Sequence, residues 1–188
     1  MQYVIWGGAA LPQSAGVEPL TTGDMLVLEG PWPLGKTALG FLLDDAALAA
    51  LLAPASGAGG FAVEGLEAPA AGGAFVIAAH KMLDAAGFRP YAEVIPNMLR
   101  RFGAHSLARG GRVTRLGGDF VPDRGVVIEF ASVDAVVEFY TSSIYAPLRD
   151  LRLRTTDPRF VVLSRNGVIP KEAREKAETF LRGRITAR

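Results

Sequence analysis

The stretch GVVIEFASVDAVVEFYTSSIYAPLRDLRLR, residues 125–154, joins an apolar strand to a helix and then to a run of tyrosines and arginines. Ser132 is a favourable N-cap for this helix, and Asp134 suits its first turn. Valines and Tyr140 recur behind them at helical spacing, which indicates a face packed on a sheet. The earlier stretch TALGFLLDDAALAALLAP, residues 37–54, has the same order of elements without the charges and aromatic rings. The chain therefore carries two related strand–helix units.

The relation between the two units extends along most of the chain. The segments that align are 3–5 with 75–77, 28–30 with 116–118, 38–42 with 126–130, and 61–63 with 160–162. Each half then follows the order strand, connection, strand, strand, helix, strand, which is the βαββαβ order of a ferredoxin-like domain. The loops GPWPLGK and GDFVPDRG contain Pro and Gly, and we expect each to form a hairpin between the central strands.

The first connection differs between the halves. In the second half, apolar residues recur at helical spacing from Tyr91 to Phe102, which predicts a helix that begins near Pro90 and ends at Gly103. In the first half the matching segment, LPQSAGVEPLTTG, is too rich in Pro and Gly for a full helix. An amphipathic helix is predicted in the tail, over residues 168–184. We expect it to dock where the first half lacks its helix, or on a partner chain.

The predicted strands are apolar on both faces. Such sheets need cover on both sides, so we expect the two halves to pack sheet against sheet as a pseudo-dimer within one chain. The predicted fold class is α+β, with tandem ferredoxin-like βαββαβ repeats and a C-terminal helix. The predicted divisions are a degenerate half over 1–70, a complete half over 71–166 and a helical tail over 167–188.

Composition excludes several classes of site. Of the 188 residues 49% are hydrophobic and none is cysteine, which excludes disulfides, thiolate metal sites and cysteine catalysis, and favours a cytoplasmic location. No apolar run is long enough to span a membrane, and the apolar N-terminus is expected to be a strand. The acidic first half and basic second half are expected to face each other, so we predict no nucleic-acid or membrane partner.

Glu129 and His80 are the candidate catalytic residues. Glu129 lies within an apolar strand, where an unpaired carboxylate is costly. It is expected either to pair with Arg109 or Arg149, or to act as a general base or ligand anchor between the sheets. His80 ends a strand and should share a face with Ala78. It is interpreted either as a rim histidine bonded to backbone or as an acid/base.

Tyrosines and arginines after the second helix are candidates for ligand binding. Tyr140, Tyr145, Arg149 and Arg152, together with Arg109, have the phenols and guanidinium groups that recognise a carboxylate. Alternatively, Tyr145 anchors the helix end and the arginines pair with acidic residues of the other half. The two histidines lack metal-ligand spacing, so no metal or cofactor is predicted.

The second half resembles the bacterial family called domain of unknown function 1330. The matching motifs are the Gly-rich turn at Arg109, the strand VIEF, a Ser-led helix, and Phe139, Tyr140, Ser143, Tyr145, Leu148, Arg149 and Arg152 in order. The resemblance covers about residues 74–165. It implies membership of the dimeric α/β barrel superfamily, and thus two ferredoxin-like sheets that close on each other within the chain. The first half departs from the pattern, since Phe41 stands where Glu129 would align.

Two functions fit this sequence. The first is binding of a small organic anion in the cleft between the halves, either without catalysis or with cofactor-free acid/base catalysis as in relatives within that superfamily. The alternative is a noncatalytic scaffold or interaction domain. The chain is expected to act as a monomeric pseudo-dimer or as a homodimer.

Overall fold

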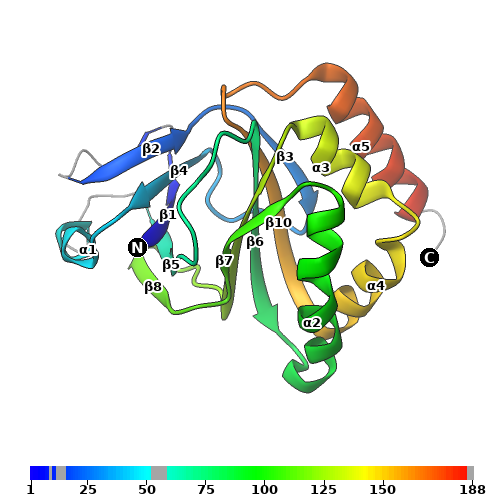
Figure 1. Ribbon diagram of the computed structural model, residues 1–188, viewed down its shortest axis with the longest axis horizontal. Coiled ribbons are helices and arrows are strands. Elements are labelled where there is room, and N and C mark those ends of the chain that lie inside the picture. Colours follow the sequence, from blue (N-terminus) through cyan, green and yellow to red (C-terminus); the bar gives the residue numbers. More distant parts are fainter. Residues whose placement is uncertain (9, 12–15, 52–58, 186–188) are drawn as a thin grey trace.

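The computed structural model describes residues 1–185 except 9, 12–15 and 52–58. Within those residues the protein is an α+β fold of two antiparallel five-stranded sheets and five helices (Figure 1). The strands are β1 (Gln2–Gly7), β2 (Val17–Thr21), β3 (Met25–Glu29), β4 (Thr37–Leu42), β5 (Gly60–Glu64), β6 (Ala74–Met82), β7 (His105–Arg109), β8 (Val113–Gly117), β9 (Arg124–Phe130) and β10 (Thr156–Ser164). The helices are α1 (Asp45–Leu51), α2 (Ala85–Arg101), α3 (Val133–Thr141), α4 (Ala146–Thr155) and α5 (Lys171–Ile185).

The two sheets exchange one strand each. Sheet A has the order β2-β4-β1-β5-β8, and sheet B has the order β3-β10-β6-β9-β7. Strand β3 therefore lies in the opposite sheet from β2 and β4 and pairs with β10, while β8 lies in the opposite sheet from β7 and β9 and pairs with β5. Figure 1 shows β3 in blue beside the orange β10.

This exchange corrects the predicted hairpins. The loops before β4 and before β9 do not join paired strands, because β3 and β8 lie in the opposite sheet from β4 and β9. A short Pro- and Gly-rich loop between apolar strands suits a connection between facing sheets as well as it suits a hairpin. The connection expected in the first half also contains a strand, β2, although residues 12–15 of that segment lie outside the described part.

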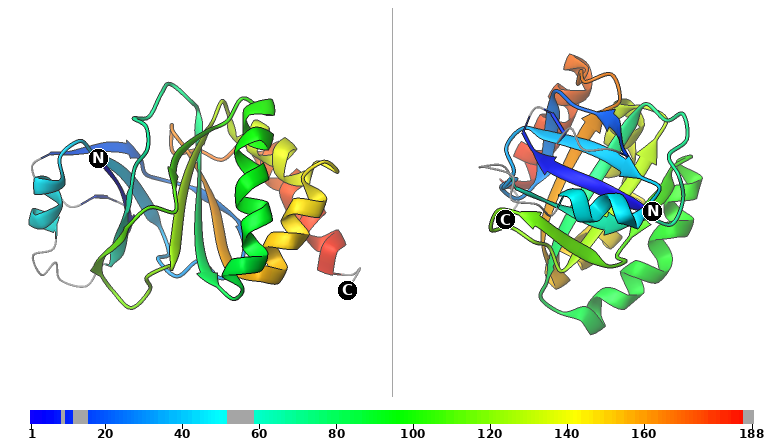
Figure 2. Two further views of the ribbon diagram at one scale, coloured as in Figure 1. Left: turned by 60° about the horizontal axis from the view of Figure 1, so that its bottom comes forward. Right: turned by 90° about the vertical axis from the view of Figure 1, so that its left-hand side faces the viewer.

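The sheets pack face to face through an inner cluster of buried side chains, as the apolar strands predicted. It consists of Tyr3, Ile5, Leu20, Leu39, Phe41, Phe61, Val63, Phe75, Ile77, Ala79, Leu107, Ala108, Val127, Val161 and Leu163. Burial of each large apolar side chain stabilises the fold by roughly 1.5–3 kcal/mol. Figure 2 shows α1 beyond sheet A and the other four helices beyond sheet B, so the fold has four layers.

Helices α2 and α3 begin at side-chain caps. Ser132 accepts a hydrogen bond from the backbone N of Ala135 at 3.1 Å, as predicted. Helix α2 begins at Ala85, earlier than the predicted start near Pro90, because Asp84 caps it by accepting a hydrogen bond from Gly87 N at 2.9 Å. Both of its prolines are therefore inside the helix.

The tail helix lies on the second half. Helix α5 contacts α3 and the exchanged strand β3, so the prediction that it fills the place of the missing helix on the first half was wrong. The outer face of sheet A is instead covered by α1, whose Leu48 and Leu51 join a separate cluster with Val4 and Trp6. No helix in the described ranges is long and apolar enough to cross a membrane.

Candidate functional site

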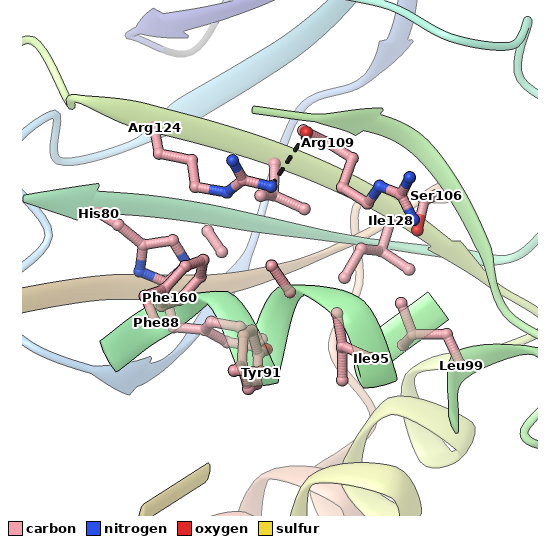
Figure 3. Close-up of a pocket in the computed structure, with 13 residues that line it drawn as sticks. His80, Phe88, Tyr91, Ile95, Leu99, Ser106, Arg109, Arg124, Ile128 and Phe160 are labelled. Atoms are coloured by element: carbon pink, nitrogen blue, oxygen red, sulfur yellow. Dashed lines mark hydrogen bonds between the residues drawn. The ribbon is translucent and has the colours of Figure 1, made fainter. Parts of the chain in front are cut away.

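A narrow cavity lies between α2 and the helix-facing side of sheet B (Figure 3). Its volume is about 30 Å³, which is room for one or two water molecules. The apolar part of its wall is formed by Ala78, Phe88, Ala92, Ile95, Leu99, Val126, Ile128 and Phe160. Strand alternation in β9 and the helical spacing in α2 bring these side chains together.

Polar groups lie at both ends of this cavity. Figure 3 shows His80 and Arg124 near one end and Arg109 and Ser106 near the other. His80 and Arg124 are direct partners in the register of β6 and β9, so their side chains stand side by side on one face. Arg124 Nη2 donates a hydrogen bond to the backbone O of Arg109 at 3.1 Å. Tyr91, from α2, completes the polar lining.

His80 is buried beside the cavity. Its side chain is 2% exposed and shares a face with Ala78, as strand alternation predicted. Its Nδ1 atom has no hydrogen-bond partner, and neither has the buried Nε of Arg124. The expected position at the rim was wrong, because the ring is buried. Two unpaired polar atoms at one end of a cavity form a site that can accept a polar ligand.

The cavity is electropositive. Burial, and then the charges of Arg152 and Arg124, hold the pKa of His80 well below its usual 6.5, so the imidazole is neutral at pH 7. Burial and the neighbouring Arg109 also lower the pKa of Arg124. In the described part of the chain, neither Arg109 nor Arg124 forms an ion pair with an acidic residue. This arrangement favours an anionic ligand.

The Gly-rich turn makes space for Arg124. Gly110 has φ +74°, a conformation that favours glycine, and a Cβ atom there would overlap the Arg124 guanidinium. Its backbone N also donates to Gly125 O at 2.8 Å, which fixes the turn against β9. The motif thus positions a cavity residue.

A second polar network lies behind the cavity. Arg152 is fully buried and donates hydrogen bonds to both carboxylate oxygens of Glu29, at 2.5 and 2.8 Å. Its Nε donates to Tyr145 Oη at 3.1 Å, and that hydroxyl lies 3.3 Å from Tyr91 Oη. Tyr140 donates to Glu29 at 2.5 Å. Burial and the Glu29 charge raise the pKa of Tyr140, so this phenol stays protonated.

These contacts place four of the five candidate ligand-binding residues. Arg149 donates to the backbone O of Tyr140 at 2.6 Å, and its guanidinium lies 4.8 Å from the Phe180 ring. Together with Tyr140, Tyr145 and Arg152 it belongs to internal packing. This matches the alternative in which Tyr145 anchors the helix end and an arginine pairs with an acidic residue of the first half, here Glu29. Of the five, only Arg109 lines the cavity.

Glu129 lies on the opposite face of sheet B. It accepts hydrogen bonds from the backbone N atoms of Ala70 and Gly72, at 2.8 and 3.0 Å, and from Arg165 at 2.6 Å. The expected partners Arg109 and Arg149 were wrong; Arg165 takes their place. Because His80 faces the helices and Glu129 faces sheet A, the structure does not bring the two candidate catalytic residues together.

The expected cleft between the sheets is occupied by the inner cluster. An open hollow lies at one end of this interface, lined by Gly7, Gly8, Pro33, Leu34, Gly59, Gly118, Asp119 and Phe120. Asp119 is the one ionisable side chain among these lining residues, and it is fully exposed. The hollow therefore offers less chemistry than the cavity under α2.

Sequence reasoning missed Arg124, Tyr91 and Glu29. Arg124 precedes Val126 and Ile128 at strand spacing, which is the signal that places it on their face. Tyr91 was assigned only to the apolar stripe of its helix. Nothing in the local pattern of β3 indicates that Glu29 joins the second half.

Residues 73–166 match the family model described as domain of unknown function (DUF1330). This match covers half of the chain. The protein belongs to this family. No curated protein matches this DUF1330 chain. All residues of the cavity lie inside the matched segment, whereas Glu29 lies outside it. Within the described ranges, no group of three or more His, Asp or Glu side chains is placed to hold a metal ion.

Proposed function

We propose that this DUF1330 protein binds a small organic anion, a carboxylate, in the cavity between α2 and sheet B. One observation carries the proposal: His80 Nδ1 and Arg124 Nε are buried there without hydrogen-bond partners. An unsatisfied buried polar group costs about 1–3 kcal/mol. A carboxylate would accept hydrogen bonds from both side chains and balance the charge of Arg124.

The dimensions of the cavity favour a small ligand. About 30 Å³ admits little more than a carboxyl group, so the short apolar end of acetate or propionate would lie against Ile95 and Ile128. Arg109 and Ser106 also line an open hollow outside the cavity, which offers a route of entry. If the bound anion reacts, His80 is the group that can take up a proton. Such chemistry would be cofactor-free acid/base catalysis.

Titration with acetate and propionate, followed by isothermal calorimetry and by NMR of the histidine rings, tests the proposal. Arg124→Gln and His80→Gln should each weaken binding at least about tenfold, the equivalent of one charge-assisted hydrogen bond. Arg115→Gln is the matched control, because Arg115 is exposed and pairs with Asp119 away from the cavity. Equal affinity in all four proteins, or no binding to the unaltered protein, would refute the proposal.

A noncatalytic scaffold is the second candidate. It is supported by the pairing of Glu129 with Arg165 and of Arg152 with Glu29, which leaves both carboxylates committed to structure. A scaffold would fold and assemble normally in the Arg124→Gln and His80→Gln variants, and would show no response to acetate.

We also infer that the two halves are diverged ferredoxin-like copies that form an intrachain dimeric α/β barrel. Four strands of each half have the same spatial order relative to their order along the chain: β2-β4-β1-β5 in sheet A and β7-β9-β6-β10 in sheet B. The remaining strand of each half, β3 or β8, pairs with the last strand of the other half. This arrangement supports a monomeric pseudo-dimer, with a homodimer as the alternative. Light scattering would distinguish a 19.9 kDa particle from one of twice that mass. A cytoplasmic location without nucleic-acid or membrane partners stays a prediction from composition.

A further inference from the structure

Glu29 belongs to the first half of the chain, but its carboxylate binds side chains of the second half. Glu29 ends β3, which lies outside the family segment in sequence but pairs with β10 in sheet B. Its side chain is 8% exposed and holds both terminal nitrogens of Arg152. Tyr140 adds a third hydrogen bond to the same carboxylate. Glu29 is therefore fixed inside the helix layer of the second half.

Arg152 links Glu29 to the cavity wall through two sets of contacts. Its guanidinium lies 5.0 Å from the ring of Phe160, which lines the cavity. Its Nε donates to Tyr145, whose hydroxyl is hydrogen-bonded to that of Tyr91. Tyr91 also lines the cavity. Each step is a contact between buried groups, so displacing Arg152 would move two side chains of the wall.

We propose that Glu29 is a positioning residue for the anion-binding cavity: by holding Arg152 it fixes Phe160 and Tyr91, so the first half completes the site of the second. This inference rests on the proposed function for its ligand, but not for its geometry. The first half is then more than a cover for sheet B, because its exchanged strand supplies a buried charge that the second half requires.

Electrostatics supply an independent readout. The charged groups that face His80 are Arg152 from α4 and Arg124 from β9, and both oppose its protonation. Glu29 balances the first of these cations. Asp123, next to Arg124, is instead engaged with Lys81 and with the backbone N of Met82. A change in the Glu29–Arg152 pair should therefore be visible in the titration of His80.

The decisive variant is Glu29→Gln combined with Arg152→Met, which leaves net charge unchanged and no unpaired buried ion. The matched control is Glu129→Gln combined with Arg165→Met, because this second Glu–Arg pair lies on the opposite face of sheet B. The chain has two histidines, so His105, which is exposed, serves as the internal reference in the NMR titration. Acetate affinity is measured on the same samples.

In the Glu29/Arg152 variant we expect acetate to bind at least fivefold more weakly and the titration midpoint of His80 to rise. The Glu129/Arg165 control should change neither. Tyr145→Phe removes only the link from Arg152 to Tyr91, and should weaken acetate binding at least twofold; it decides the question if the double variant does not fold. An unchanged His80 midpoint and unchanged affinity in a folded variant would overturn the inference. If acetate does not bind the unaltered protein, the proposed ligand fails, while displaced NMR signals of the Tyr91 and Phe160 rings in the Glu29/Arg152 variant would still support the positioning role of Glu29.

Discussion

Gly110 and Arg124 occupy adjoining space at the cavity: a side chain on the glycine would overlap the guanidinium. The two residues lie on different segments, yet the backbone N of Gly110 is bonded to Gly125, next to Arg124. The Gly-rich turn of the family segment thus has a steric role in the candidate site, in addition to its left-handed backbone.

The first prediction follows from this contact. Gly110→Ala should lower the free energy of unfolding by about 1–2 kcal/mol, because alanine is strained at positive φ, and should weaken acetate binding by moving Arg124. Gly103→Ala is the matched control, since Gly103 has φ +65° with no atom within 4 Å of the added Cβ. Calorimetry and urea denaturation of both variants separate strain from displacement. Equal acetate affinity in the two variants would contradict the steric role.

The second prediction concerns Glu129. Glu129→Gln should lower the free energy of unfolding by about 1–3 kcal/mol, because two backbone N–H groups and Arg165 lose a charged acceptor. The amides of Ala70 and Gly72 should exchange with deuterium faster than in the unaltered protein. Acetate binding should not change. A loss of acetate binding with normal stability would instead mean that Glu129 belongs to the binding site.

The third prediction is a dependence of stability on pH. Unfolded His80 titrates near 6.5, whereas folded His80 has a pKa well below that value. Between these two values the unfolded chain binds a proton that the folded protein does not. The free energy of unfolding should therefore fall as pH drops below about 6.5, by at most about 1.4 kcal/mol per pH unit from this group.

Urea denaturation at several pH values between 7.5 and 5, with His80→Gln for comparison, measures this contribution. The variant should lose less stability over the interval than the unaltered protein. Parallel curves for the two proteins would mean that His80 is not held neutral by its surroundings.

The fourth prediction tests the packing between the sheets. Phe75→Ala should cost about 3–5 kcal/mol of unfolding free energy, since this ring is fully buried in the inner cluster. Leu83→Ala, at a position 67% exposed, should change stability by no more than about 0.5 kcal/mol. Thermal and urea unfolding of the two variants provide the comparison, and a mild effect of Phe75→Ala would argue against close contact of the sheets.

Local patterns predicted the parts of the fold that depend on local chemistry. Ser132 and the spacing of apolar residues behind it located α3, and strand alternation placed His80 on the face of Ala78. These features depend on neighbours within a few residues. The start of α2 was misplaced because Pro90 is a stronger sequence signal than Asp84, although Asp84 makes the cap.

Long-range pairing was beyond the reach of these patterns. Several arginines could neutralise Glu129, and only the path of the chain brings Arg165 to it. The composition of β3 and β8 likewise does not indicate which sheet each strand joins, because an amphipathic strand can pair with any suitable edge. Glu29 could not be linked to the second half for the same reason.

The reciprocal crossing of β3 and β8 also governs how the molecule comes apart. Removing either half would strip a strand from the other and leave the edge of β5 or β10 bare, and bare edges promote aggregation. If the chain is cut between β5 and β6, each fragment alone should aggregate, and native structure should form only when the two fragments are mixed. Each half therefore depends on the other for the strand that covers one edge of its sheet.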